Sequence, residues 1–458
     1  MTEPYDVAIV GAGVVGTALA RELAGYDLRC VVLDAASDVG SGTSKANTAI
    51  LHTGFDATPG TLEATLVRRG AELLHAYAAA TGIAVERTGA LLVAWDDDQL
   101  AALPTLAGKA RRNGYEAIRP VTAEELYARE PHLGPGARGG LAVPDESIVC
   151  PWTTPLAYAT EALAGGVEFR LSTRLLAVHP GPDDDHLLDT SRGRLRARWL
   201  VNAAGLGSDL VDRMLGHEDF TITPRRGELI VYDKLARPLV SSILLPVPTA
   251  RGKGVLVAPT VYGNVLLGPT AEDVEDRADA ATTAAGLAGL VEKGRRILPG
   301  LVEEEVTATY AGLRAATEHP DYRIRVHGEQ RYACAGGIRS TGLSASMAIA
   351  EHLVELLEDA GLKLLPTARP DPPRMPALGE AMVRPYQRAD LIAADPAYGE
   401  IVCHCERVTR GELRDALASP LPPTDLEGLR RRTRAVNGRC QGFWCGADVA
   451  GLLEDGAR

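Results

Sequence analysis

The chain has 458 residues, of which 46% are hydrophobic and 24% are charged. These values are typical of a globular protein with a sizeable core, and the length predicts about three domains. The net charge of −12 excludes a general nucleic-acid binder, although a few local cations can still bind a small anion. No signal peptide and no apolar run of ~20 residues is visible. We therefore expect a cytoplasmic protein without a transmembrane segment, which leaves peripheral contact with the inner face of a membrane open.

The beginning of the chain predicts a nucleotide-binding unit. From Tyr5 to Asp34 the pattern indicates a strand, a tight turn, a helix and a second strand, with Gly11, Gly13 and Gly16 around the turn. In this spacing the first glycine permits the turn, the second lets backbone N–H groups approach a pyrophosphate, and the third lets helix and strand pack closely. Asp34 can accept hydrogen bonds from ribose hydroxyls and would repel a 2′-phosphate. The motif predicts dinucleotide binding and disfavours NADP, but it does not separate FAD from NAD.

The middle of the chain changes its pattern several times. Residues 61–81 have apolar positions at helical spacing and predict an amphipathic helix. From residue 83, short strand-like runs alternate with a helical stretch near 97–113. Runs within 167–209 predict strands that return to the first sheet. Segments between 215 and 310 predict a second, antiparallel sheet.

Two later glycine-rich passages favour FAD over NAD. Residues 201–209 form an apolar strand that ends in small residues, among them Ala204 and Gly205, which suits close approach to the dinucleotide from a second side. Residues 335–350 read as a glycine-rich turn, including Gly337, that opens a long helix. A helix N-terminus aimed at the N1–C2=O edge of the isoalloxazine would stabilise the anionic reduced flavin. A nicotinamide enzyme would not need this third element, so we expect FAD.

Four of the seven cysteines gather near the C-terminus, as Cys403-x-Cys405 and Cys440-x4-Cys445. An odd total in a chain expected to be cytoplasmic argues against a disulfide framework. Four thiolates suit either structural zinc or a [2Fe–2S] cluster, but zinc sites commonly use a longer spacing in both halves. The tight Cys-x-Cys pair resembles the ligand pattern of bacterioferritin-associated-ferredoxin-like domains. It therefore favours a [2Fe–2S] cluster, with zinc as the alternative.

Two further features accompany this module. The remaining thiols, Cys30, Cys150 and Cys334, have apolar neighbours and are expected to be buried and inert. The run 430–439 is basic. It is either a solvated helix face or a patch that offsets the charge of the cluster or docks an acidic redox partner, and the sequence does not choose between these interpretations.

These elements predict an α/β plus α+β protein. A Rossmann-type FAD domain is interleaved with an antiparallel-sheet substrate domain, and a small C-terminal iron–sulfur domain follows. The expected FAD-binding domain comprises 1–82, 145–214 and 311–362, the substrate domain 83–144 and 215–310, the proline-rich linker 363–398, and the cysteine domain 399–458.

Several motifs together resemble the FAD-dependent glycerol-3-phosphate dehydrogenases and oxidases of the D-amino-acid-oxidase-like superfamily. They are GTSKANTAILHTGFDATPGTL (42–62), ESIVCPW (146–152), KGVLVAPTVYGNVLLGPTA (253–271), AGLRAAT (311–317) and the C-terminal cysteines. The resemblance extends over nearly the whole chain. It is nearest to the bacterial anaerobic-type subunit that carries an extra [2Fe–2S] domain.

The resemblance implies roles only where residues match. His52 falls where the oxidases have an active-site histidine near the flavin, and Lys253 and Arg314 fall where the family has basic residues around the substrate. A neutral imidazole suits the role of base in alcohol oxidation, and the guanidinium offers a planar fork to a phosphate or carboxylate. The resemblance also implies flavin contacts at four positions, which are Thr43, Ser44, Ser340 and Gly342.

The expected activity is FAD-dependent oxidation of a small anionic alcohol, glycerol 3-phosphate, to dihydroxyacetone phosphate. Electrons would leave singly through the cluster to a redox partner subunit or a quinone. Arg339 departs from the family pattern, because many relatives have an acidic or neutral residue in this loop, and a second cation beside the flavin could change the preferred anion. It keeps 2-hydroxy acids such as 2-hydroxyglutarate, and amines, as alternative substrates. A non-catalytic electron-transfer subunit is the alternative of a different class.

Overall fold

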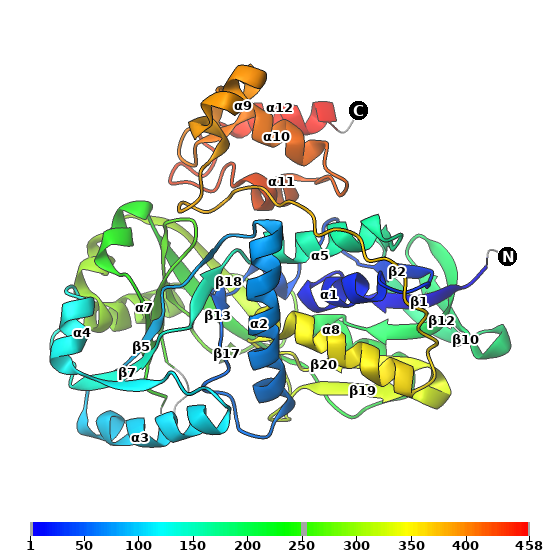
Figure 1. Ribbon diagram of the computed structural model, residues 1–458, viewed down its shortest axis with the longest axis horizontal. Helices are drawn as coiled ribbons and strands as arrows, with labels where there is room; N and C mark the ends of the chain where they lie inside the picture. Colours follow the sequence, from blue (N-terminus) through cyan, green and yellow to red (C-terminus); the bar gives the residue numbers. More distant parts are fainter. Residues whose placement is uncertain (1–2, 249–253, 457–458) are drawn as a thin grey trace.

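The computed structural model describes residues 3–248 and 254–456. Two sheets lie side by side in the body of the molecule, the long helix α2 (Leu62–Thr81) runs between them, and a small C-terminal unit sits on top (Figure 1). In the ranges that the structure describes, no helix combines the length and hydropathy that a bilayer crossing requires.

The first sheet is built on parallel strands in the order β20-β12-β1-β2-β9. Its central strands are apolar and almost fully buried, because helices and neighbouring segments cover both faces. The parallel strands are β1 (Tyr5–Val10), β2 (Cys30–Leu33), β9 (Glu168–Arg170), β12 (Gly193–Asn202) and β20 (Tyr332–Gly336). Antiparallel strands β10 (Leu175–Pro180), β11 (His186–Thr190) and β19 (Arg323–His327) extend it. Helices α1 (Val14–Leu23), α5 (Thr153–Ala164) and α8 (Gly342–Asp359) share its main core.

The second sheet has the order β17-β13-β16-β15-β14-β5-β7-β6, with β18 on the other side of β13. Its pairs are antiparallel except that of β14 with β5. The strands are β5 (Ala90–Ala94), β6 (Arg119–Thr122), β7 (Gly139–Val143), β13 (Thr223–Tyr232), β14 (Ile243–Pro246), β15 (Leu256–Pro259), β16 (Val265–Gly268), β17 (Glu272–Asp273) and β18 (Val306–Ala316). Helices α3 (Asp97–Arg112), α4 (Ala123–Arg129) and α7 (Ala284–Ile297) accompany it. Strand β18 runs through residue 311, where the sequence placed a domain limit; the limits themselves stay a prediction.

A small third sheet connects the two. It has the order β3-β8-β4, from β3 (Ile50–Leu51), β8 (Ser147–Val149) and β4 (Val85–Glu86). Helix α2 begins at a Thr61 cap that accepts a hydrogen bond from the N–H of Ala64, and it ends at Gly82 with φ of 77°. The helices expected at 61–81 and near 97–113 are therefore confirmed. Helix α6 (Ser208–Met214) follows the end of β12.

The C-terminal unit has its own small core around Val408, Leu413 and Leu429. It contains α9 (Ala389–Ala394), β21 (Ile401–Cys403), β22 (Val408–Thr409), α10 (Arg410–Leu417), α11 (Leu426–Thr433) and α12 (Gly446–Gly456). The proline-rich segment that leads to it is extended along the body (Figure 1). Backbone hydrogen bonds of 2.8 Å at Leu365 and Thr367 tie this segment to the loop between α1 and β2.

Candidate active site and cysteine centre

The nucleotide loop has no room for side chains at its first and third glycines. Gly11 has φ of 110°, and a Cβ there would lie 2.4 Å from the carbonyl oxygen of Ala203. A Cβ on Gly16 would lie 1.9 Å from the oxygen of Gly11. Helix α1 begins after Gly13, which provides no side-chain cap, so N–H groups of its first turn point outward without an intrahelical acceptor. This glycine-lined helix start fits the pyrophosphate of a dinucleotide.

Asp34 stands at the end of β2, beside this loop. Its Oδ2 accepts a hydrogen bond of 2.6 Å from the N–H of Ala12, and its Oδ1 accepts one of 2.7 Å from the N–H of Ala36. Burial raises the pKa of Asp34, and these two N–H groups oppose the rise. Each oxygen uses one lone pair in this way, so a second remains for a ribose hydroxyl. The carboxylate is thus held in the position that the sequence predicted.

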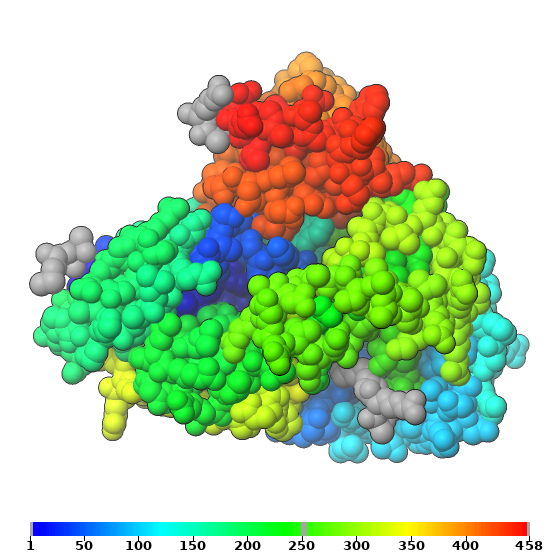
Figure 2. Space-filling model, turned by 180° about the vertical axis from the view of Figure 1, so that it is seen from behind, coloured from blue at the N-terminus to red at the C-terminus, as the bar shows by residue number. Residues whose placement is uncertain are grey.

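The segment Thr43–Lys45 forms a short 3-10 helix that joins the two sheets. The Oγ of Ser44 accepts a hydrogen bond of 3.0 Å from the N–H of Val14, at the start of α1. The hydroxyl of Thr43 donates to the carbonyl of Leu313 on β18 at 3.0 Å. The predicted flavin contacts Thr43 and Ser44 therefore lie between the nucleotide loop and the second sheet. Figure 2 shows N-terminal residues, in blue, in a recess beneath the C-terminal unit.

Two further glycine-rich segments border the first sheet. Ala204 and Gly205 follow β12, and Gly205 has φ of 56°. Gly337, with φ of 65°, follows β20, and Gly342 begins α8. The side chain of Thr341, the N-cap of α8, accepts no hydrogen bond from the first turn, so this long helix also presents N–H groups at its start. Ser340 is exposed in the same loop. These are the second and third elements that the sequence predicts for a flavin.

His52 is paired with a buried carboxylate that the sequence did not reveal. Strands β3 and β8 pair Leu51 with Ser147, and this antiparallel register brings the next residues, His52 and Glu146, together. Nδ1 of His52 lies 3.0 Å from Oε2 of Glu146, whose side chain is 0% exposed, whereas the imidazole is 22% exposed. Oε1 of Glu146 accepts from the N–H and the hydroxyl of Thr53, at 2.7 and 3.0 Å. The carboxylate therefore orients the imidazole.

The histidine also lies close to the third glycine-rich element. The backbone N–H of His52 donates a hydrogen bond of 2.8 Å to Oγ of Ser344, in the first turn of α8. Two of the predicted groups, the histidine and the start of α8, are thereby brought together.

Arg314 is a largely buried cation on β18. Its Nη1 and Nη2 donate long hydrogen bonds of 3.4 and 3.5 Å to the carbonyl oxygen of Thr270. Among residues 3–248 and 254–456, no carboxylate forms an ion pair with it, and burial, with a smaller effect of Arg225, lowers its pKa. Gly227 leaves space for it, since a Cβ there would lie 2.7 Å from Nη2. An unpaired buried guanidinium suits an anionic ligand. The third predicted basic or catalytic residue, Lys253, lies outside the described residues.

Arg339, the residue that departed from the family pattern, donates from its guanidinium to the carbonyl oxygen of Pro320. The loop that contains Pro320 is fixed by Asp321, whose two carboxylate oxygens accept from the N–H groups of Leu62 and Glu63 at 2.7 and 3.0 Å. Arg339 thus joins its loop to the start of α2.

The four C-terminal cysteines form two facing pairs. Cys403 and Cys445 are buried and lie within side-chain contact of each other, as do the partly exposed Cys405 and Cys440. Backbone N–H groups of Trp444, Gly442 and Phe443 lower the pKa of Cys440, and such groups stabilise a thiolate.

In the described part of the chain, no three His, Cys, Asp or Glu side chains are grouped so that they could hold a single metal ion. Two pairs of thiolates suit a cluster in which each of two irons takes two sulfur ligands. The donor set thus fits a [2Fe–2S] cluster. The other three thiols, Cys30, Cys150 and Cys334, are buried as predicted.

Three arginines of the basic run next to the cysteines are buried, whereas Arg439 is exposed and Arg430 is partly exposed. Arg431 and Arg432, on α11, bind Asp38 in the loop between β2 and Thr43, with distances of 2.6 to 2.7 Å. All three side chains are less than 10% exposed. The interpretation as a solvated helix face is therefore wrong for these arginines. Their partner lies almost 400 positions away, and they attach the cysteine unit to the FAD-side loop.

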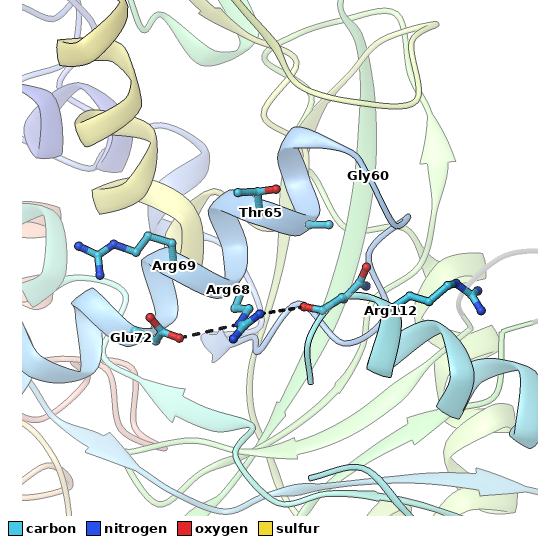
Figure 3. A pocket seen from close by; sticks show the side chains of 8 residues that line it. Gly60, Thr65, Arg68, Arg69, Glu72 and Arg112 are labelled. Carbon is cyan, nitrogen blue, oxygen red and sulfur yellow. Dashed lines mark hydrogen bonds and ion pairs between the residues drawn. The ribbon is translucent and has the colours of Figure 1, made fainter. Parts of the chain in front are cut away.

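A surface hollow of about 350 Å³ lies away from these residues. It lies between α2 and the end of α3, and Thr65, Arg68 and Arg112 are among the residues that line it (Figure 3). Arg68 is paired with Glu72 at 3.9 Å, and both are more than half exposed. Exposed, internally compensated charges of this kind bind anions weakly, so this hollow is not the active site.

Comparison with known proteins supports the assignment of both cofactors. Residues 6–356 match the model of the FAD dependent oxidoreductase family, and residues 401–455 match that of the BFD-like [2Fe-2S] binding domain. The first match covers most of the chain. The expectations of FAD and of a [2Fe–2S] cluster are thereby confirmed.

Similar whole proteins match most or nearly all of the chain. A glycerol 3-phosphate dehydrogenase of Caloramator mitchellensis is 33% identical over 98% of this chain and 94% of its own length. A glycerol 3-phosphate oxidase of Mycoplasma pneumoniae is 30% identical over 78% of this chain and 95% of its own. The structure of the dithionite-reduced L-alpha-glycerophosphate oxidase of Mycoplasma pneumoniae with FAD bound has a TM-score of 0.77 and 28% identity, over 81% of this chain and 98% of that one. The chain therefore belongs to the FAD-dependent oxidoreductases and carries a BFD-like [2Fe–2S] domain at its C-terminus.

Proposed function

We propose that this protein oxidises glycerol 3-phosphate to dihydroxyacetone phosphate. The observation that carries the proposal is the pairing of His52 with buried Glu146 at the start of α8. Similarity to a dehydrogenase and an oxidase named for this substrate supports the choice of substrate. When bound, FAD supplies a hydride acceptor and the cluster a one-electron carrier.

His52 is the proposed base. Oxidation of a secondary alcohol removes the hydroxyl proton while the carbon-bound hydride departs. With Nδ1–H donated to Glu146, the imidazole is the tautomer whose lone pair is on Nε2, the atom that accepts the proton. The buried carboxylate then stabilises the imidazolium that forms, as in other histidine–carboxylate pairs.

Arg314 is the proposed binding group for the phosphate, with Lys253 as a second cation. A planar guanidinium with no carboxylate partner within the described ranges can offer two parallel N–H donors to a phosphate. Arg339, by contrast, donates to the Pro320 carbonyl. Its engagement there favours glycerol 3-phosphate over the 2-hydroxy acids that a free second cation would attract.

The flavin contacts proposed from the sequence fall into four segments: the loop after β1, the Thr43–Lys45 segment, the end of β12 and the loop that leads to α8. Electrons leave through the cluster to a redox partner subunit or to a quinone, and the latter requires peripheral contact with a membrane. Phe443 and Trp444, 93% and 71% exposed beside Cys445, form the proposed exit face.

A substrate panel under anaerobic conditions tests the proposal. Glycerol 3-phosphate, 2-hydroxyglutarate and a set of amino acids are mixed with the oxidised holoenzyme, and the flavin absorbance is followed. We expect glycerol 3-phosphate to bleach the flavin fastest. If 2-hydroxyglutarate or an amine bleaches it while glycerol 3-phosphate leaves it oxidised, the substrate assignment is wrong. If no compound of the panel bleaches it, the chain acts as an electron-transfer subunit.

A further inference from the structure

Arg434 has an unusual backbone for an arginine. It follows the last residue of α11 with φ of 69°, in the left-handed region where a helix normally ends on glycine. Its side chain is nevertheless only 5% exposed, and it forms an ion pair with Glu406. Arg407, Val436 and Gln441, around the cysteine loops, also have positive φ values. Strain that accumulates in this way is retained where the surrounding contacts serve a function.

The guanidinium of Arg434 covers a pair of stacked aromatic rings from the body of the protein. Its Cζ lies 4.0 Å from the centroid of the Tyr262 ring and 5.6 Å from that of Trp152. The two rings are 5.1 Å apart and inclined by 21°. Nε1 of Trp152 donates to the carbonyl oxygen of Lys45 at 3.1 Å. The aromatic pair is therefore hydrogen-bonded to the Thr43–Lys45 segment, which lies beside the nucleotide loop.

The same guanidinium reaches the cysteine centre. Its Nε donates to Oε2 of Glu406 at 2.8 Å, and Glu406 directly follows Cys405 in the chain. Glu406 is 2% exposed and is also bound by Lys234 at 3.1 Å. One side chain thus contacts the rings that adjoin the flavin-side segment and the loop that carries a cluster ligand.

We propose that Arg434 is a positioning residue for electron transfer: it holds the Cys405 loop against the Trp152–Tyr262 pair and so fixes the cluster relative to the flavin. The inference rests on the proposed electron flow. Oxidation of the alcohol releases two electrons, and the cluster passes them one at a time to a one-electron acceptor. Because electron transfer slows steeply with distance, a loosened loop slows the step from flavin to cluster.

Attachment of the cysteine unit has a separate structural basis. Arg431 and Arg432, in the last turn of α11, bind Asp38 in the loop after β2, whereas Arg434 binds Glu406. Loss of the Arg434 side chain is therefore expected to leave the unit attached while its cysteine loop shifts. Substitution of Arg434 therefore tests the position of the cysteine loop without removing the arginines that attach the unit.

The test uses the full holoenzyme and three substitutions at one position. Arg434→Met removes the charge, Arg434→Lys keeps the charge but loses the planar contact with the rings, and Arg434→Gly retains only the backbone conformation. Arg410→Met, at a 43% exposed arginine of the same unit that pairs with Glu400, is the control. Flavin bleaching and cluster reduction are followed separately after anaerobic mixing with glycerol 3-phosphate. Flash photoreduction of the flavin repeats the measurement without substrate.

We expect all three Arg434 variants to bleach flavin at the parental rate and to reduce the cluster at least about tenfold more slowly, because loss of the buried pair with Glu406 releases the Cys405 loop and a longer distance slows electron transfer. The cluster midpoint potential should fall in Arg434→Met, where Glu406 loses a compensating charge, and stay near the parental value in Arg434→Lys. Cluster reduction at the parental rate in Arg434→Lys or Arg434→Met overturns the proposal.

The control variant and the photoreduction measurement distinguish a failure of the role proposed for Arg434 from a failure of the proposed substrate. Arg410→Met is expected to match the parent in both phases, and a slow cluster phase in it overturns the assignment to Arg434. If glycerol 3-phosphate bleaches no flavin even in the parent, the proposed substrate is wrong. The photoreduction arm still decides the role of Arg434 in that case, because it does not depend on the substrate.

Discussion

Nδ1 of His52 lies 3.0 Å from Oε2 of Glu146, although 94 residues separate them in the chain. Short antiparallel pairing between β3 and β8 brings the two together, and burial of the carboxylate leaves the imidazole as its partner on the exposed side. This pair relates the fold to the chemistry, because it fixes both the position and the tautomer of the proposed base.

Replacement of Glu146 by glutamine should slow flavin reduction strongly. The amide keeps the shape but no longer favours the tautomer with the lone pair on Nε2, so we expect a loss of about 10²-fold or more. Anaerobic stopped-flow measurement of flavin bleaching checks this. Asp145→Asn, at the exposed neighbouring position, is the control and should retain the parental rate. An unaffected rate in Glu146→Gln would show that the carboxylate has no part in the reaction.

A double-variant cycle examines whether the pair acts as one unit. His52→Ala alone should remove the base, and adding Glu146→Gln should then cost little more, because residues that act together are not additive. Independent, multiplying losses in flavin reduction would contradict this coupling.

Loss of Arg314 should weaken substrate binding. Hydrogen bonds to a charged group contribute about 1.5–3 kcal/mol, so Arg314→Met should raise the KM for glycerol 3-phosphate by about 10- to 100-fold. The control is Arg225→Met, because Arg225 lies opposite Arg314 in the strand register but is paired with Asp273. Steady-state kinetics check the result, and equal KM values for Arg314→Met and the parent would exclude the binding role.

A methyl group on Gly16 should abolish FAD retention. Its Cβ would lie 1.9 Å from the oxygen of Gly11, so the loop and the helix start must separate. We expect purified Gly16→Ala to contain little flavin by absorbance. Gly289→Ala, whose Cβ would meet nothing within 4 Å, should bind FAD like the parent. Stoichiometric flavin in Gly16→Ala would refute the close packing described for the loop.

Attachment of the cysteine unit should depend on pH through Asp38. Burial alone would raise the pKa of Asp38, but Arg432 and Arg431 hold it below its ordinary value. The stabilisation is therefore complete above the ordinary aspartate pKa of about 3.9, and it is lost as the pH falls through the lower native pKa.

Asp38→Asn should reduce the unfolding free energy at neutral pH by about 3–5 kcal/mol, because two buried arginines lose their partner. Asp390→Asn, in an exposed pair with Arg388, should have little effect. Denaturant unfolding measured from neutral to acid pH checks both, and the difference between parent and Asp38→Asn should shrink below the native pKa. A difference that persists unchanged into acid would contradict this assignment.

Short sequence patterns predict those features of this protein that are formed by residues close together in the chain. The glycine turn with Asp34, the helix over Leu62–Thr81 and the two motifs Cys403-x-Cys405 and Cys440-x4-Cys445 each depend on neighbours in the chain, and each is recognised in its sequence window. Glu146 was within a motif that indicated the family, yet only the register of two short strands reveals its partner.

The buried arginines illustrate the opposite case. A run of basic residues normally indicates solvent exposure, because an unpaired buried charge is very costly. Asp38, which compensates Arg431 and Arg432, is distant in sequence, and the rings that receive Arg434 come from two separate segments. Asp38 directly precedes Val39, and Glu146 is followed after one residue by Ile148 and Val149; an acid this close to apolar residues is the weak signal that such partners leave.

Freeze-quench EPR after anaerobic mixing of the oxidised holoenzyme with glycerol 3-phosphate tests the central claim most directly. The account predicts that the flavin bleaches and that the signal of a one-electron-reduced [2Fe–2S] cluster then appears. A flavin that stays oxidised, or a bleached flavin accompanied by no cluster signal, would contradict it.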